Sequence, residues 1–404
     1  MEWKEVTLGD LCEISSSKRI FAKEYQSDGV PFYRGKEIIA KQKGNAISNE
    51  LFISRNRYEE IKARYGVPQQ RELLLTSVGT LGVPYVIKEE EFYFKDGNLT
   101  WFRHFNGLDV EYLYYWFLSP YGKNEINTKA IGSTQKALTI DSLSKFDIKI
   151  PANLDDQRRI ASILSSLDRK IELNNKINAD LEEMAQAIFK NWFVDFEPFK
   201  DGKFVDSELG MIPEGWKVGR LTEIASYMNG LAMQKYPPEN NEDSLPVLKI
   251  KELGQGFCGT DSDRCSCNIK DECKIHNGDV IFSWSGTLLV DVWCGGDCGL
   301  NQHLFKVTSK DYPKWFYYYW TKHHLQEFIH IAKDKAVTMG HIKRGHLEEA
   351  MVAIPDNDSM EKAHELFEPI LSKMISLRLE NSRLSTLRDT LLPRLMSGEL
   401  EVPE

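Results

Sequence analysis

The sequence predicts an α+β protein in which a mixed α/β domain and a long helix occur twice in one chain. Three observations support this fold class. Landmark residues of the first half recur in the same order in the second half, and each repeat contains short β-forming runs separated by turn residues. Each repeat also ends in apolar residues with heptad spacing. The expected architecture is two duplicated α/β domains separated by two long antiparallel coiled-coil helices.

The domain boundaries follow from the repeat and from the two heptad stretches. A chain of 404 residues exceeds what one hydrophobic core usually organises, so two domains are the starting expectation. We expect a first α/β domain at 1–152, a central helix at 153–193, a second α/β domain at 194–356 with a linker at 194–215, and a second helix at 357–404.

The internal repeat is visible as pairs of short matching segments. Each single match is weak, but the order is kept and the spacing drifts by only a few residues. A repeat of roughly 205–215 residues is far too long for a solenoid unit, so it indicates duplication of a whole domain with its connector. The matching segments are 3–11 and 216–224, 31–37 and 246–252, 72–81 and 279–288, and 98–151 and 301–355.

Within each repeat, the globular part mixes strands and short helices. Runs rich in β-branched or aromatic residues and bounded by Gly, Pro, Asn or Asp predict strands. Two aromatic runs, 110–118 and 314–327, lack Gly and Pro and predict helices with many buried faces. The predicted strands lie at 73–77, 85–87, 92–94, 147–150, 279–283, 304–307 and 350–354.

The end of each repeat predicts a long helix. The stretch 155–192 contains no Gly or Pro, and a helix of about 38 residues would run about 57 Å. Because a whole domain separates the two stretches, the chain returns between them and the helices are expected to lie antiparallel. Asn174 and Asn178 occupy seam positions and favour one register. The apolar seam positions are Ile160, Leu164, Leu167, Ile171, Leu181, Ala185 and Ile188, and then Ala363, Phe367, Ile370, Met374, Leu377, Leu384 and Leu391, with Asn381 among them.

Composition excludes several classes of protein. The chain is 42% hydrophobic and 27% charged, and no apolar stretch approaches the length of a membrane span. Its first residues carry charge and lack the apolar core of a signal peptide, so a cytoplasmic location is expected. A net charge of -9 argues against a simple basic nucleic-acid binder, although a basic face can coexist with an acidic back.

The seven cysteines are unevenly distributed. An odd number in a cytoplasmic chain argues against a disulfide framework. Thiolates at Cys-x-Cys and Cys-x3-Cys spacing leave zinc open as an alternative to reduced, packed thiols, but paired Cys-x2-Cys knuckles are absent. The cluster comprises Cys258, Cys265, Cys267, Cys273, Cys294 and Cys298, and Cys12 stands alone.

No catalytic constellation emerges from the sequence. There is no phosphate-binding loop, and Tyr236-Pro237-Pro238-Glu239 lacks the leading amide or acid and the aromatic residue of an adenine-methyltransferase motif. We therefore predict no catalytic residue, no cofactor and no metal site. An enzyme with unfamiliar motifs and a zinc-stabilised duplicated scaffold are the alternatives.

Several segments resemble type I restriction-modification specificity subunits. Residues 191–199 (Asn-Trp-Phe-Val-Asp-Phe-Glu-Pro-Phe), followed by 207–216, resemble the junction between the central helix and the second recognition domain of that family. Residues 391–400 resemble the end of its second helix. With residues 132–136 and the Ile-Pro ends of both domains, the resemblance spans the whole chain.

The resemblance implies a DNA-reading protein that leaves catalysis to other chains. Two target-recognition domains, related by pseudo-twofold symmetry, would each read one half of a bipartite double-stranded DNA target. The long helices would set the spacer and dock two methyltransferase (modification) subunits, which motor-nuclease (restriction) subunits can join. A subunit that serves methylation only is the runner-up.

Candidate DNA contacts are loop cations, amides and hydroxyls. Arg and Lys suit guanine, Asn and Gln suit adenine, and Ser or Thr can serve either. In the first domain they are Lys18, Arg19, Arg34, Lys36, Gln69, Gln70, Arg71, Thr76, Ser77, Thr80, Ser133, Thr134, Gln135 and Lys136. In the second domain they are Lys249, Lys251, Ser283, Trp284, Ser285, Thr287, Asn301, Gln302, His303, Lys335, Thr338, His341 and Lys343.

Overall fold

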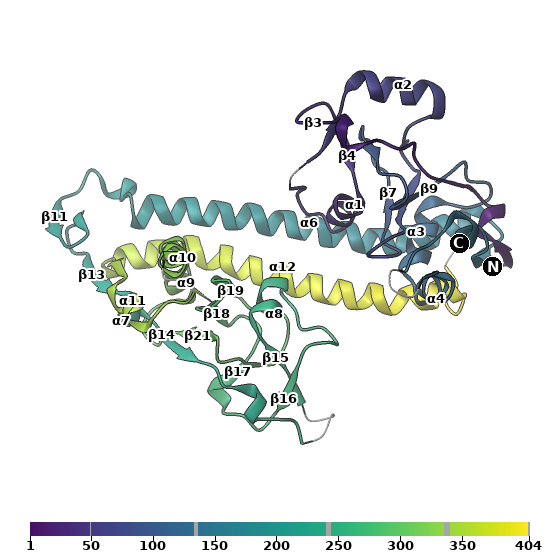
Figure 1. Ribbon diagram of the computed structural model, residues 1–404. Coiled ribbons are helices and arrows are strands. Elements are labelled where there is room, and N and C mark those ends of the chain that lie inside the picture. Colours follow the sequence, from purple (N-terminus) through teal and green to yellow (C-terminus); the bar gives the residue numbers. More distant parts are fainter. Residues whose placement is uncertain (49, 133–135, 240–243, 335–339, 403–404) are drawn as a thin grey trace. The chain divides into compact units, whose positions relative to one another are not determined.

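The protein divides into two compact units, each with its own strands and helices (Figure 1). The computed structural model describes residues 1–48, 50–132, 136–239, 244–334 and 340–402. Unit 1 comprises Met1–Glu172 and Leu384–Glu404, and unit 2 comprises Leu173–Arg383. Each unit therefore contains a part of both long helices, α6 (Leu154–Phe193) and α12 (Asn357–Ser397).

Among its described residues, the globular part of unit 1 contains three small sheets. Their orders are β1-β10, β2-β9-β6-β7 and β3-β5-β4-β8. Neighbouring strands are antiparallel except for the parallel pair β4-β8. The strands are β1 (Trp3–Thr7), β2 (Glu13–Ser15), β3 (Tyr25–Gln26), β4 (Val30–Tyr33), β5 (Phe52–Ile53), β6 (Leu73–Thr76), β7 (Pro84–Val86), β8 (Tyr93–Phe94), β9 (Leu99–Arg103) and β10 (Asp147–Pro151). The shorter helices are α1 (Gly35–Gln42), α2 (Arg55–Tyr65), α3 (Val110–Leu118), α4 (Pro120–Lys129) and α5 (Ile140–Ser144).

Unit 2 repeats this arrangement after a β11-β12 hairpin. Its sheets have the orders β13-β22, β14-β21-β18-β19 and β16-β15-β20-β17. The strands are β11 (Phe204–Ser207), β12 (Gly210–Pro213), β13 (Lys217–Arg220), β14 (Ser226–Asn229), β15 (Ser244–Leu248), β16 (Arg264–Ser266), β17 (Lys274–Ile275), β18 (Val280–Ser283), β19 (Leu289–Val292), β20 (Cys298–Leu300), β21 (Leu304–Thr308) and β22 (Met351–Ile354). The shorter helices are α7 (Leu221–Ile224), α8 (Ile250–Gln255), α9 (Lys314–His323), α10 (Leu325–Asp334) and α11 (Arg344–Glu349).

The sheet topology confirms the duplication that the sequence predicted. The sheet β14-β21-β18-β19 has the same strand order and antiparallel pairing as β2-β9-β6-β7. The parallel pair β15-β20 likewise matches β4-β8. The repeats differ between these landmarks, because unit 1 has β5 and α2 where unit 2 has β16 and β17.

The long helices run antiparallel within each unit. In unit 1, Ile160 and Leu164 near the start of α6 belong to one buried cluster with Leu392 and Leu395 near the end of α12. In unit 2, Phe189 near the end of α6 packs with Phe367 near the start of α12. Burial of these seam residues removes apolar surface from water and holds the helices together.

Polar contacts complete the seam inside unit 2. Asn174 Nδ2 donates to Asn381 Oδ1 and to Glu380 Oε2, both at 2.9 Å, and Asn381 Nδ2 donates to Asn175 Oδ1 at 2.8 Å. A register shift would separate these amides. This group of amide hydrogen bonds therefore specifies one axial alignment of α6 against α12.

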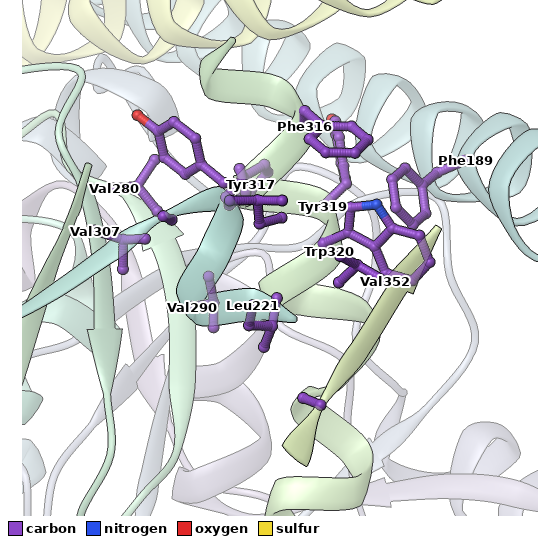
Figure 2. Packing of buried hydrophobic residues seen from close by; sticks show 14 of the residues in the cluster. Phe189, Leu221, Val280, Val290, Val307, Phe316, Tyr317, Tyr319, Trp320 and Val352 are labelled. Carbon is purple, nitrogen blue, oxygen red and sulfur yellow. The ribbon is translucent and has the colours of Figure 1, made fainter. Parts of the chain in front are cut away.

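The core of unit 2 is rich in aromatic side chains. Figure 2 shows Phe189 of α6 beside Trp320 of α9, and their ring centroids are 5.1 Å apart at an interplanar angle of 84°. Such edge-to-face contacts are favoured by the ring quadrupoles. The aromatic run that begins at Lys314 is thus core packing, as its sequence predicted.

Two expectations about helix bounds require correction. The run 314–327 is not one helix, because α9 ends at His323 and α10 begins at Leu325. The ring of His324 bonds the main-chain oxygen of Met351 at 2.9 Å, a long-range contact at the break. The helix expected over 357–404 ends at Ser397, where Gly398 takes a positive φ of 81° that terminates it.

Candidate functional site

The predicted contact residues of the two units fall on equivalent loops. The loop after β6 corresponds to the loop after β18, since both follow the same strand of the repeated sheet. An isolated antiparallel bridge joins Val78 to Ala137 in unit 1, and a matching bridge joins Ser285 to His341 in unit 2. In each unit the fold thus brings together two loops that lie far apart in the chain, whereas Lys18, Arg19 and residues 69–71 of unit 1 have no predicted counterpart in unit 2.

Two of the predicted contacts in unit 1 are buried. Thr76 Oγ1 accepts a hydrogen bond from the main-chain N–H of Val83 at 2.9 Å. Ser77 Oγ lies 2.5 Å from Thr100 Oγ1 and 3.2 Å from the main-chain oxygen of Leu75. Because these hydroxyls bond within the fold, we remove Thr76 and Ser77 from the candidate interface.

The same correction applies to three predicted contacts in unit 2. Ser283, Ser285 and Asn301 are buried. Ser283 Oγ donates to the main-chain oxygen of Thr287 at 2.8 Å, and Asn301 Oδ1 accepts from the main-chain N–H of His303 at 3.2 Å. These side chains hold their loops in shape and are not accessible to a large partner.

Two candidate cations occupy matching positions before a helix. Arg34 precedes α1 and Lys249 precedes α8, and both backbones are extended. Arg34 bonds the buried carboxylate of Glu37 at 2.7 Å. Burial by itself would raise the pKa of Glu37, but the hydrogen bonds from Arg34 hold it below its usual value. Lys249 pairs with Asp263, so an internal carboxylate partly neutralises each of these cations.

The remaining candidates are accessible to different degrees. Arg71 takes a positive φ of 63° and pairs with the buried Asp109 at 2.9 Å, and Lys251 pairs with Asp261 at 2.7 Å. Ser133, Thr134, Gln135, Lys335 and Thr338 lie outside the described residues. The exposed candidates are Lys18, Arg19, Lys36, Gln69, Gln70, Arg71, Thr80 and Lys136 in unit 1, and Lys251, Thr287, Gln302, His341 and Lys343 in unit 2.

Two half-buried candidates of unit 2, Trp284 and His303, belong to an aromatic group. The Trp284 ring lies 6.0 Å from the His303 ring, 5.7 Å from the Phe305 ring and 6.4 Å from the His341 ring. Among the described residues, Trp284 Nε1 and His303 Nδ1 are buried without a hydrogen-bond partner. A buried polar atom without a partner costs about 1–3 kcal/mol, so this group carries unused hydrogen-bonding capacity.

Sequence reasoning missed part of a cavity in unit 1. A cavity of about 340 Å³ is lined by the Ser15–Lys18 loop and by Arg64, Tyr65 and Arg103. Only Lys18 of this set was predicted. The available signal was a helix with four exposed or half-exposed basic residues and an exposed Tyr65 at its end. The sequence does not show that the end of α2 lies near β2 and β9.

A second cavity, of about 270 Å³, lies in unit 2. It is lined by Met233, Gln234, Val247, Lys249, Asp263, Arg264 and Asn301. Its lining contains the carboxylate of Asp263, which bonds Lys249. The lining of the unit 2 cavity thus combines cations with a carboxylate, whereas the charged residues that line the unit 1 cavity are all cations.

The structure offers no metal-ligand set in the part of the chain that it describes. No three histidine, cysteine or carboxylate side chains among those residues come together as a metal site would require. The zinc-stabilised scaffold considered from the sequence therefore has no set of zinc ligands among these residues.

No helix among the described residues combines the length and apolarity that a bilayer span requires.

Alkylation is expected to distinguish the cysteines. Burial raises the pKa of Cys12 to about 12 and that of Cys294 to about 11, so almost no thiolate forms at pH 8. A hydrogen bond with Cys298 lowers the pKa of Cys258, and Cys267 is half-buried. We expect iodoacetamide to modify Cys258 and Cys267 first, as measured by peptide mass spectrometry. The urea-unfolded chain, in which all seven should react, is the control, and equally fast labelling of Cys12 in the folded protein would contradict the assignment.

The repeated fold and its loop sites place the chain in a known class of proteins. The family model described as "Type I restriction modification DNA specificity domain" matches residues 1–183 and 213–383, one match for each repeat. The chain belongs to this family. It is a type I restriction-modification specificity subunit, a non-catalytic component of its complex.

Individual relatives agree with this assignment. The chain is 28% identical to the type I restriction enzyme MjaIX specificity subunit of Methanocaldococcus jannaschii, over 100% of this chain and 94% of that one. It is 23% identical to the type I restriction enzyme HindI specificity subunit of Haemophilus influenzae, over 65% and 71% of the two chains. The crystal structure of the S subunit from M. genitalium has the same fold, with a TM-score of 0.56 at 15% identity over 98% of this chain and 96% of that one.

Proposed function

We propose that this specificity subunit reads a bipartite double-stranded DNA target, with one unit for each half-site. The observation that carries the proposal is the repetition of one sheet topology with polar and basic side chains exposed on equivalent loops. Base edges are read by such side chains, and phosphates by the cations around them. We assign the reading of the two halves to residues 1–152 and 194–356, and the helical roles to 153–193 and 357–404.

The complex in which the chain acts is part of the same proposal. The long helices would dock two methyltransferase subunits and fix the spacer, motor-nuclease subunits would join for restriction, and the complex would work in the cytoplasm. A net charge of -9 is tolerable in a DNA reader if the methyltransferases supply the basic surface that closes around the duplex. Tight target binding by the chain alone would contradict that point.

A domain exchange tests the proposal. Residues 1–150 are replaced by the corresponding domain of another specificity subunit, and the chain is co-expressed with its methyltransferase. Genome-wide mapping of methylated adenine should show a bipartite motif in which one half changes while the other half is kept. A matched exchange within 217–353 should change the opposite half. A continuous short motif, or no methylation from the unaltered chain, would rule the proposal out.

A further inference from the structure

The cavity of unit 1 is built from four separate segments. Ser15 ends β2 and residues 16–18 follow it, Arg64 and Tyr65 end α2, Tyr93 belongs to β8, and Trp101 and Arg103 belong to β9. Its volume of about 340 Å³ lies in the range of ligand-binding pockets, about 300–1,000 Å³. We call it the α2 cavity.

The side chains that line the α2 cavity give it a positive charge. Lys18, Arg64 and Arg103 contribute to the lining, and no carboxylate does among the described residues. Arg103 bonds Glu13 at 2.5 Å and Arg64 lies 3.5 Å from Glu60, but both carboxylates belong to residues outside the lining. The Lys18 ammonium lies 4.6 Å from the centre of the Tyr65 ring, which steers it by a cation–π contact. The cavity therefore favours an anion.

The cavity also has a free hydrogen-bonding group. Ser15 Oγ is buried and has no hydrogen-bond partner among the described residues. The segment after Ser15 is fixed, because Ser17 Oγ donates to the main-chain oxygen of Phe94 and the main-chain N–H of Lys18 donates to Tyr93 Oη, both at 2.7 Å. The Ser15 hydroxyl would gain the partner that it lacks if its side chain rotated toward an anion in the cavity.

This site is specific to the first unit. Helix α2 has no counterpart among the described residues of unit 2, where β16 and β17 occupy the corresponding part of the chain. The cavity of unit 2 contains Asp263, whose carboxylate would repel an anion. A duplicated structural feature would occur in both units, so the α2 cavity is an addition to the common fold.

We propose that the α2 cavity binds a backbone phosphate of the DNA target, held by Lys18, Arg64 and Ser15. The inference rests on the proposed function, because the DNA read by unit 1 supplies the phosphodiester. Tyr65, whose side chain is 50% exposed, lies at the cavity and offers a flat face to the adjoining sugar or base. Phosphate contacts fix position and register without reading sequence, so the cavity anchors the first unit on the duplex.

Charge-neutral variants test the anchor. Lys18→Gln, Arg64→Gln and Ser15→Ala are compared with Lys62→Gln, which removes an exposed cation from the same helix α2 but does not line the cavity. The whole chain is purified with its methyltransferase, and duplex binding is measured at several salt concentrations. We expect Lys18→Gln and Arg64→Gln to weaken binding roughly tenfold and to reduce the slope of log K against log[salt] by about 0.9, the value of one phosphate contact. Ser15→Ala should weaken binding about threefold.

The outcomes separate the anchor from the proposed function. The methylation motif should stay the same in every variant, because a phosphate contact carries no sequence information. If Lys18→Gln and Arg64→Gln behave like Lys62→Gln, the anchor is wrong while the reading of a bipartite target stands. If the unaltered complex shows no preference for any duplex, the proposed function itself fails. Titration with deoxyadenosine monophosphate distinguishes a second source of phosphate, since binding of the free nucleotide with no change in DNA affinity would overturn the proposal.

Discussion

Phe367→Ala is expected to lower the free energy of unfolding of unit 2 by about 3–5 kcal/mol, the usual cost of truncating a buried phenylalanine. The Phe367 side chain is 0% exposed and stacks on Trp315, with ring centroids 4.7 Å apart and an interplanar angle of 12°. It also contacts Phe189 and Phe193 of α6, so its loss leaves a cavity where the two long helices meet in this unit. Urea unfolding followed by tryptophan fluorescence measures the change.

The neighbouring residue provides a matched control for this substitution. Leu366 precedes Phe367 on the same helix, and its side chain is 41% exposed. Leu366→Ala should alter the free energy of unfolding by less than about 0.5 kcal/mol, as exposed substitutions usually do. Equal destabilisation by the two variants would show that the aromatic cluster does not support the start of α12.

Gln157→Ala is expected to destabilise unit 1 by about 3 kcal/mol, because it strips partners from buried main-chain groups. The Gln157 side chain is 0% exposed at the first turns of α6. Its Oε1 accepts from the N–H of Asp109 at 2.8 Å, and its Nε2 donates to the oxygens of Gly107 at 3.0 Å and Pro151 at 2.9 Å. One amide thus ties α6 to the start of α3 and to the end of β10.

Hydrogen exchange locates the effect of this second substitution. The Asp109 amide and the first turn of α3 should exchange faster in Gln157→Ala than in the unaltered chain, while the amides of β18 and β21 in unit 2 keep their protection. Arg159→Ala is the control, because that side chain is 43% exposed and pairs only with Asp156 in the described part of the chain, at 3.6 Å. Uniform loss of protection in both units would contradict a local role for Gln157.

The candidate interface shows most clearly where sequence reasoning reached its limit. Loop hydroxyls were predicted to be accessible contacts, yet Thr76 and Ser283 bond main-chain groups of the loops that follow them, and Ser77 bonds Thr100 of β9. Their burial depends on strands and bridges contributed by distant residues, and local composition does not encode that. The α2 cavity was missed for the same reason, since Lys18 and Arg64 are brought together only by the fold.

By itself, the sequence determined the duplication, the two long helices and seven of the strands. These features rest on local patterns: heptad spacing places Ile160 and Phe367 on the buried face, and short apolar runs mark β6 and β18. Tertiary structure decided which polar groups meet. It paired Asn174 with Asn381, gave the Gln157 side chain three hydrogen-bond partners, and continued α12 through Pro369. Periodicity fixes the face of the helix on which a residue lies. A hydrogen bond depends on a partner that is often distant in the chain, and Asn174 and Asn381 are 207 residues apart.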